Sequence, residues 1–139
     1  MSIFFRHRRR FVERLDRARI EEAICCVERA TAAPVRVAVL PHVRGDVVRA
    51  AELAAAKLGL TSLPERHGVV IAVVPARRAF AVWGDRAAHE KIGDASWKAI
   101  AAAIAEPFQR GDFTAGLVAG VEAVGRHLAA AFPPRPHGT

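Results

Sequence analysis

The first part of the chain passes from a helix-like hydrophobic pattern to a strand-like one. Apolar residues recur every three or four positions over 11–31, which predicts an amphipathic helix with one buried face. Pro34 prevents this helix from continuing, because proline lacks the backbone N–H that a helix interior needs. The next segment, VRVAVL at 35–40, is partly alternating and rich in β-branched residues, so it predicts a strand.

A second helix and a pair of strands follow. Asp46 is placed to cap a helix that stops at Gly59, because glycine readily adopts the conformation that ends helices. The run GVVIAVV at 68–74 is apolar throughout and predicts a central strand buried on both faces. A short turn separates it from RAFAVW at 78–83, so we expect the two strands to form an antiparallel hairpin.

The second half of the chain is helical. Glycine and aspartate breaks divide it into predicted helices at 86–92, 95–106 and 113–132. A strand–helix–strand unit requires a right-handed parallel crossover, and the hairpin adds an antiparallel neighbour. The pattern therefore predicts an α/β fold: a three-layer α/β/α sandwich whose mixed sheet has helices on both faces. Ligands of such sheets tend to bind at the carboxyl edge of the parallel strands.

Length and composition agree with one globular unit. The 139 residues are 52% hydrophobic and 25% charged, which is enough for a single hydrophobic core. We expect a basic N-terminal segment at 1–10, one domain at 11–132 and a disordered Pro-rich tail at 133–139. No stretch approaches the roughly 20 apolar residues that cross a bilayer, and the apolar stretch at 1–5 is too short for the core of a secretory signal. We therefore expect a cytoplasmic protein without a transmembrane segment.

The two cysteines, Cys25 and Cys26, are adjacent in a predicted helix. Adjacent cysteines rarely form a disulfide with each other, and there is no third cysteine, so a disulfide framework is excluded. We interpret them as small buried or half-buried thiols. A thiol pair that binds a soft metal is the alternative.

Candidate chemistry gathers in WGDRAAHEKIGDASW at 83–97. Asp85 follows a predicted strand, His89 and Glu90 lie about one helical turn later, and Asp94 lies beyond the next break. Carboxylates and an imidazole at such junctions could hold a hard divalent cation, because these ions prefer several oxygen ligands. The alternative is that the two aspartates cap helices and that the other two residues are ordinary polar groups. The chain contains no GxSxG, GxxxxGK[ST] or GxGxxG motif.

Positive charge is concentrated at the N-terminus. The formal net charge is +7, and the first ten residues contain four arginines but no acidic residue: Arg6, Arg8, Arg9 and Arg10. Such a run can contact the phosphates of a nucleic acid or of an anionic lipid. The alternative is a solvated terminus in an arginine-rich sequence.

Several ordered segments resemble the TPM domain family, named for its thylakoid, phosphatase and membrane members. HGVVIAVV and RRAFAVWGD resemble two family strands, and EPFQRGDFTAGLVAGVEAVGRHL resembles the closing helix. HEKIGDASW resembles the short soluble bacterial branch of the family. The matching pieces extend over about 115 residues, from Arg19 to Pro133.

The resemblance implies the same α/β/α sandwich and a cleft at the sheet edge. The implied cleft residues are His67, Gly68, Gly84, Asp85, His89 and Trp97, and the implied ligands for Ca²⁺ or Mg²⁺ are Asp85, Asp94 and Asp112. Family members have been linked to divalent cation binding and to weak acid phosphatase activity. Bacterial members are often encoded beside LemA-type membrane proteins, which implies a partner at the envelope and a position peripheral to the inner membrane.

Two departures from the family pattern remove acidic residues. Many members carry Asp-Asn-Gly before the central strand, where this chain has Arg66-His67-Gly68. Many carry Gly-Glu before the first strand, where this chain has Ala33-Pro34. Phosphoryl transfer needs a nucleophile or a metal clamp, and neither can be assembled from the remaining residues.

Three functions follow, in order of preference. The first is a non-catalytic binding or scaffold module near the cell envelope that holds a divalent cation. The second is a weak metal-dependent acid phosphatase that uses the same carboxylates. The third is a binder of nucleic acid or anionic lipid through the arginines of the basic N-terminal segment, and of these two partners nucleic acid is the less favoured.

Overall fold

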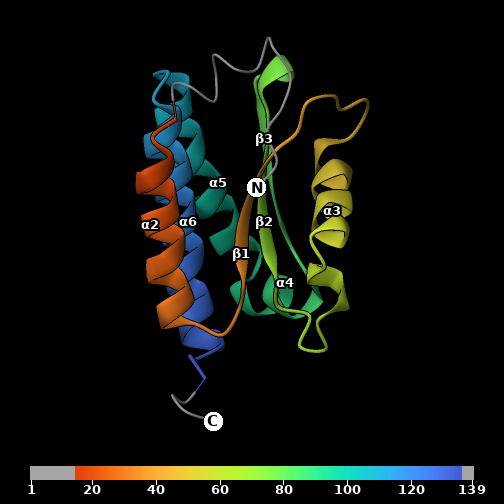
Figure 1. The fold of residues 1–139 in the computed structure, drawn as a ribbon, viewed down its shortest axis with the longest axis vertical. Coiled ribbons are helices and arrows are strands. Elements are labelled where there is room, and N and C mark those ends of the chain that lie inside the picture. The colour runs from red at the N-terminus through yellow and green to blue at the C-terminus, as the bar shows by residue number, and fades with distance from the viewer. Residues whose placement is uncertain (1–14, 136–139) are drawn as a thin grey trace.

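Figure 1 shows the computed structural model, which describes residues 15–135. These residues form three strands and five α-helices, with short 3₁₀ turns at Leu60–Ser62 and Pro75–Arg77. The elements in order are α2 (Arg17–Ala30), β1 (Val35–Val39), α3 (Val47–Lys57), β2 (Val69–Val74), β3 (Ala79–Gly84), α4 (Arg86–Ile92), α5 (Asp94–Gln109) and α6 (Phe113–Ala131).

The three strands form one mixed sheet in the order β1-β2-β3. β1 and β2 are parallel, with Val37 beside Ile71, whereas β2 and β3 are antiparallel, with Ile71 beside Val82. All six residues of β2 are buried, because this strand has a neighbour on each side and helices over both faces. The predicted crossover, hairpin and central strand are therefore confirmed.

Helices cover both faces of the sheet, as predicted for an α/β/α sandwich. Figure 1 shows α2, α5 and α6 on one side of the strands and α3 alone on the other. The α3 face has a core of small side chains, including Ala51, Ala54 and Ala55, which let the helix lie close to the sheet. The opposite face has the larger core, in which Ile71 and Val73 of β2 join Leu117 and Val121 of α6.

Glycine allows α5 and α6 to pack closely. A Cβ atom built on Gly120 would lie 2.7 Å from Ile104 Cδ1, and one built on Gly116 would lie 2.4 Å from Phe108 Cδ1. Both distances are too short for carbon atoms, so side chains at these positions would push the helices apart. Near the start of α5, the Trp97 ring lies against Gly84 at the end of β3, where the candidate site lies.

Three differences from the predicted element boundaries have a clear structural cause. α2 begins at Arg17 because Asp16 caps it, accepting a hydrogen bond from the Arg19 backbone N–H. Asp94 is the first residue of α5 rather than its cap, a position that Gly93 takes with a φ of +80°. α5 also continues past Pro107 to Gln109. The helix tolerates this proline because it lies in the last turn, so only two helical residues come after it.

Within residues 15–135, none of the helices is both long enough and apolar enough to cross a membrane. The basic segment at 1–10 lies outside the described residues, as do the last residues of the predicted tail, 136–139.

Candidate functional site

The Asp85 carboxylate lies at the end of β3 and is almost fully buried, with a residue exposure of 2%. It is the N-cap of α4, because Oδ1 accepts a hydrogen bond of 2.7 Å from the Arg86 backbone N–H. The Arg66 guanidinium binds both carboxylate oxygens: Nε donates to Oδ2 at 2.6 Å and Nη2 donates to Oδ1 at 2.9 Å. Asp85 therefore acts as a cap and as half of a bidentate ion pair.

The backbone brings these two residues together. Beyond β2 and β3, the Asp85 N–H donates to the Gly68 carbonyl and the Ala87 N–H donates to the Arg66 carbonyl, each at 2.9 Å. The hairpin pairing thus continues past both strands and aligns 66–68 with 85–87. Arg66 itself has a φ of +52°, a region that non-glycine residues rarely occupy and that Asn and Asp tolerate best.

The pair shifts the pKa values of both members. Burial alone would raise the pKa of Asp85, but the hydrogen bonds from Arg66 and from the Arg86 backbone, with the charges of both arginines, lower it below its usual value. The pKa of Arg66 is raised, chiefly by the hydrogen bond to Asp85. The carboxylate is therefore ionised and matched by a fixed positive charge at neutral pH.

His67 lies next to this pair and is also buried, with an exposure of 3%. The edge of its ring meets Phe132 at a centroid distance of 5.2 Å, and its Nδ1 atom has no hydrogen-bond partner in the described part of the chain. Burial lowers the pKa of His67; the charge of Arg135 lowers it further, while those of Glu65 and Asp85 raise it. The folded protein therefore favours the neutral imidazole.

Gly84, Trp97 and His89 form a second group of contacts at the same end of the sheet. The Trp97 ring lies against Gly84, where an added Cβ atom would be 2.6 Å from ring carbon Cζ2. Trp97 also donates from Nε1 to the His89 carbonyl at 3.2 Å and stacks on the His89 ring at a centroid distance of 5.9 Å. These residues hold α4 and α5 against β3.

The proposed metal ligands are not brought together. Asp94 is strongly exposed and approaches His89, with 3.9 Å between Oδ1 and Nε2. Asp112 caps α6 through the Ala115 N–H, beyond the far end of α5. The 16 residues of α5 span about 24 Å, so these two aspartates lie at opposite ends of that helix.

The described residues therefore do not fit a divalent cation. Ca²⁺ and Mg²⁺ need several oxygen ligands, whereas no three His, Cys, Asp or Glu residues in the described chain are grouped to hold a metal. Asp85 is the buried carboxylate of this region, and Arg66 and Arg86 already use both of its oxygens.

The implied cleft residues lie at the amino edge of the parallel strands, not at the expected carboxyl edge. His67 and Gly68 precede β2, and Asp85 follows the antiparallel β3. The reason is that β3 is antiparallel to β2, so its carboxyl end meets the amino end of β2. Because His67 and Asp85 are both buried, they do not form the walls of an open cleft.

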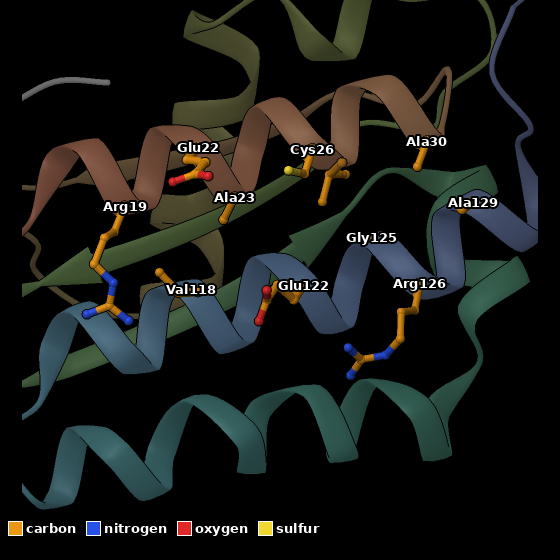
Figure 2. A pocket seen from close by; sticks show the side chains of 11 residues that line it. Arg19, Glu22, Ala23, Cys26, Ala30, Val118, Glu122, Gly125, Arg126 and Ala129 are labelled. Atoms are coloured by element: carbon orange, nitrogen blue, oxygen red, sulfur yellow. The ribbon is translucent and has the colours of Figure 1, made fainter.

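A hollow of about 550 Å³ lies elsewhere, between α2 and α6. Figure 2 shows Arg19, Glu22 and Cys26 on α2 and Glu122 and Arg126 on α6, with the Arg126 side chain extending away from α2. The charges of the two arginines and two glutamates balance, and neither the implied cleft residues nor the implied ligands for Ca²⁺ or Mg²⁺ line this hollow.

The two thiols lie on the outer surface of α2. Both Cys25 and Cys26 are exposed, which corrects the expectation of buried or half-buried side chains. The reason is their place on the helix, because the buried positions of α2 are Ile20, Ala23 and Val27. Arg29 lies one turn later and contacts both sulfur atoms, at 4.0 and 3.4 Å.

Sequence reasoning did not name Arg66 as a site residue, although it noted that the family acid is missing there. The strand register of the hairpin could have identified Arg66 as a neighbour of Asp85. Val69 pairs with Gly84, so extending that register outward sets Gly68 opposite Asp85 and places Arg66 within reach of the carboxylate. The basic run at Arg6, Arg8, Arg9 and Arg10 lies outside the described residues.

Comparisons with known proteins agree on the fold. A family model described as the TPM domain matches residues 8–127. The solution structure of the BA42 protein from the psychrophilic bacterium Bizionia argentinensis is 28% identical, with a TM-score of 0.79 over 89% of this chain and 85% of that one. No curated protein matches this chain.

Two further solution structures resemble the fold alone. The N-terminal domain of a protein from P. gingivalis is 18% identical, with a TM-score of 0.70 over 88% of this chain and 82% of that one. The N-terminal domain of the cg2496 protein from Corynebacterium glutamicum is 19% identical, with a TM-score of 0.63 over 88% of this chain and 78% of that one.

The burial of His67 predicts that acid destabilises the fold. Because its pKa is lower in the folded state than its ordinary value of 6.5, the unfolded chain binds more protons once the pH falls below that value. The free energy of unfolding should therefore fall from pH 6.5 down to the folded-state pKa, by about 1.4 kcal/mol for each unit of depression. Urea denaturation across this range measures the slope.

His67→Asn is the matched variant, because asparagine does not titrate and the other histidines remain. We expect a smaller loss of stability on acidification than in the unaltered chain, whatever the stability of the variant at neutral pH. Equal slopes of the free energy of unfolding against pH for the two proteins would show that His67 does not contribute to the loss of stability in acid.

Proposed function

Because this chain belongs to the TPM domain family, we propose that it is a non-catalytic binding module that acts through a protein partner at the cell envelope. One observation carries the non-catalytic part of the proposal. The buried carboxylate at the end of β3 is held on both oxygens by Arg66 and capped onto the Arg86 N–H. No lone pair of Asp85 is presented to a substrate in a way that a nucleophile, a general base or a metal ligand requires.

The other implied acids do not supply a substitute. Asp112 caps α6, and Asp94 is a solvated residue at the start of α5. Glu65, the acid nearest to Arg66 in sequence, is paired with Arg135 at 3.0 Å. Phosphoryl transfer depends on several charges converging on one phosphate, and these acids are distributed over separate elements. A metal-dependent acid phosphatase is therefore the less favoured function.

We expect no phosphatase activity that depends on Asp85. With p-nitrophenyl phosphate and Mg²⁺, Ca²⁺ or Mn²⁺, the unaltered chain and Asp85→Asn should release nitrophenol at rates within about twofold of each other, because the carboxylate makes no contact with substrate. Circular dichroism of both proteins provides the folding control. Cation-dependent turnover that is lost in a folded Asp85→Asn variant would instead establish the phosphatase.

The envelope partner is proposed from the family association with LemA-type membrane proteins. A TPM module could act there by binding the cytoplasmic part of such a protein, which would keep the chain peripheral to the inner membrane. Anionic lipid is the competing attachment, through Arg6, Arg8, Arg9 and Arg10. The two modes differ in their dependence on salt and on the partner.

The two modes separate in a nanodisc assay. We expect the chain to bind anionic-lipid nanodiscs that contain the LemA-type protein of the same genome, and not empty nanodiscs of the same lipid, by biolayer interferometry. Replacing the four N-terminal arginines with glutamine should leave this binding in place. Equal binding to empty nanodiscs, lost in the glutamine variant and in high salt, would favour the lipid binder instead.

A further inference from the structure

Arg66 stands where many family members have an acidic residue, yet its backbone keeps a conformation suited to one. Its φ of +52° lies in the left-handed region, where Asp and Asn are several times more frequent than other non-glycine residues. The Ala87 N–H fixes this conformation by donating to the Arg66 carbonyl. An arginine therefore occupies a backbone conformation that suits Asp or Asn.

The guanidinium supplies what the Asp85 carboxylate lacks. A buried carboxylate is costly unless positive charge and hydrogen-bond donors compensate it. Arg66 provides both through a planar fork, at 2.6 and 2.9 Å, and part of its own side chain remains in contact with water. An added cation would have to displace the Arg66 guanidinium before it reached either oxygen of the Asp85 carboxylate.

From this geometry we propose that the Arg66 guanidinium is a built-in cation that takes the place of a divalent ion at Asp85. The unaltered chain does not bind Ca²⁺ or Mg²⁺ at this carboxylate, because Arg66 bonds both Asp85 oxygens and stands where a cation would need a second carboxylate. The proposal shares with the proposed function the premise that the Asp85 oxygens are occupied, but it concerns cation binding rather than turnover.

Arg66→Asp tests the proposal because it replaces the cation with a second carboxylate. Two adjacent like charges repel, and the Asp85 charge is buried, so the chelator-stripped variant should be less stable than Arg66→Asn. Millimolar Ca²⁺ should relieve this repulsion and raise the melting temperature saturably. At a hundredfold excess over Kd the rise should be about 10 °C, because binding to the folded state alone stabilises it.

Arg66→Asn is the matched control. Asparagine suits the same backbone conformation and also removes the guanidinium, but it adds no charge. The melting temperatures of this variant and of the unaltered chain should not respond to Ca²⁺. The double variant Arg66→Asp/Asp85→Asn should also lose the response, which would assign the bound ion to the pair of carboxylates.

Three results would overturn the proposal. One is a saturable response to Ca²⁺ in the unaltered chain that Asp85→Asn removes. Another is a folded Arg66→Asp variant whose melting temperature rises with Ca²⁺ no more than that of Arg66→Asn. The third is an Arg66→Asp variant that stays unfolded in millimolar Ca²⁺ while Arg66→Asn folds. A folded Arg66→Asp variant whose melting temperature does not rise with Ca²⁺ refutes this inference alone. Phosphatase turnover that depends on Asp85 refutes the proposed function.

Discussion

The ion pair between Arg66 and Asp85 joins three parts of the chain at one point. Asp85 ends β3, begins α4 as its cap, and binds the side chain of the segment that leads into β2. Its backbone N–H also extends the hairpin by bonding to Gly68. Because the carboxylate is buried, it needs this guanidinium, and the direction of α4 depends on the same atoms.

The helices after β3 begin at the Arg66–Asp85 ion pair. α4 leaves Asp85 and ends at Gly93, and Trp97 then returns to cover Gly84 and to bond the His89 carbonyl. α5 and α6 then pack against each other, with Ile104 against Gly120. The residues that the family resemblance assigned to a cleft thus act here as contacts between elements, which is why no catalytic role is proposed for them.

Most of the fold could be predicted from the sequence because its signals are local. The apolar run of β2, the turn before β3 and the aspartate caps at Asp46 and Asp112 each act within a few residues. The site was less predictable because it depends on register. Asp85 was identified as a candidate, but its partner is 19 residues away and has the opposite charge to the family residue.

The sequence pattern also overstated how many acids share one site. Asp85, Asp94 and Asp112 recur at similar breaks, so they look alike in sequence, yet α5 separates the last two. A helix N-terminus accounts for Asp85 and Asp112 without any ligand, because its free N–H groups favour a carboxylate acceptor. A pattern of caps and a pattern of metal ligands use the same residue type, and the distance between the aspartates distinguishes the two.

The central claim is that Arg66 and Asp85 stabilise the fold as a pair, and a double-mutant cycle tests it most directly. Free energies of unfolding would be measured for the unaltered chain, Arg66→Asn, Asp85→Asn and the double variant, all in chelator at neutral pH. The account predicts strong coupling: Asp85→Asn should cost much less stability in the Arg66→Asn background than in the unaltered chain. Equal costs in the two backgrounds would contradict it.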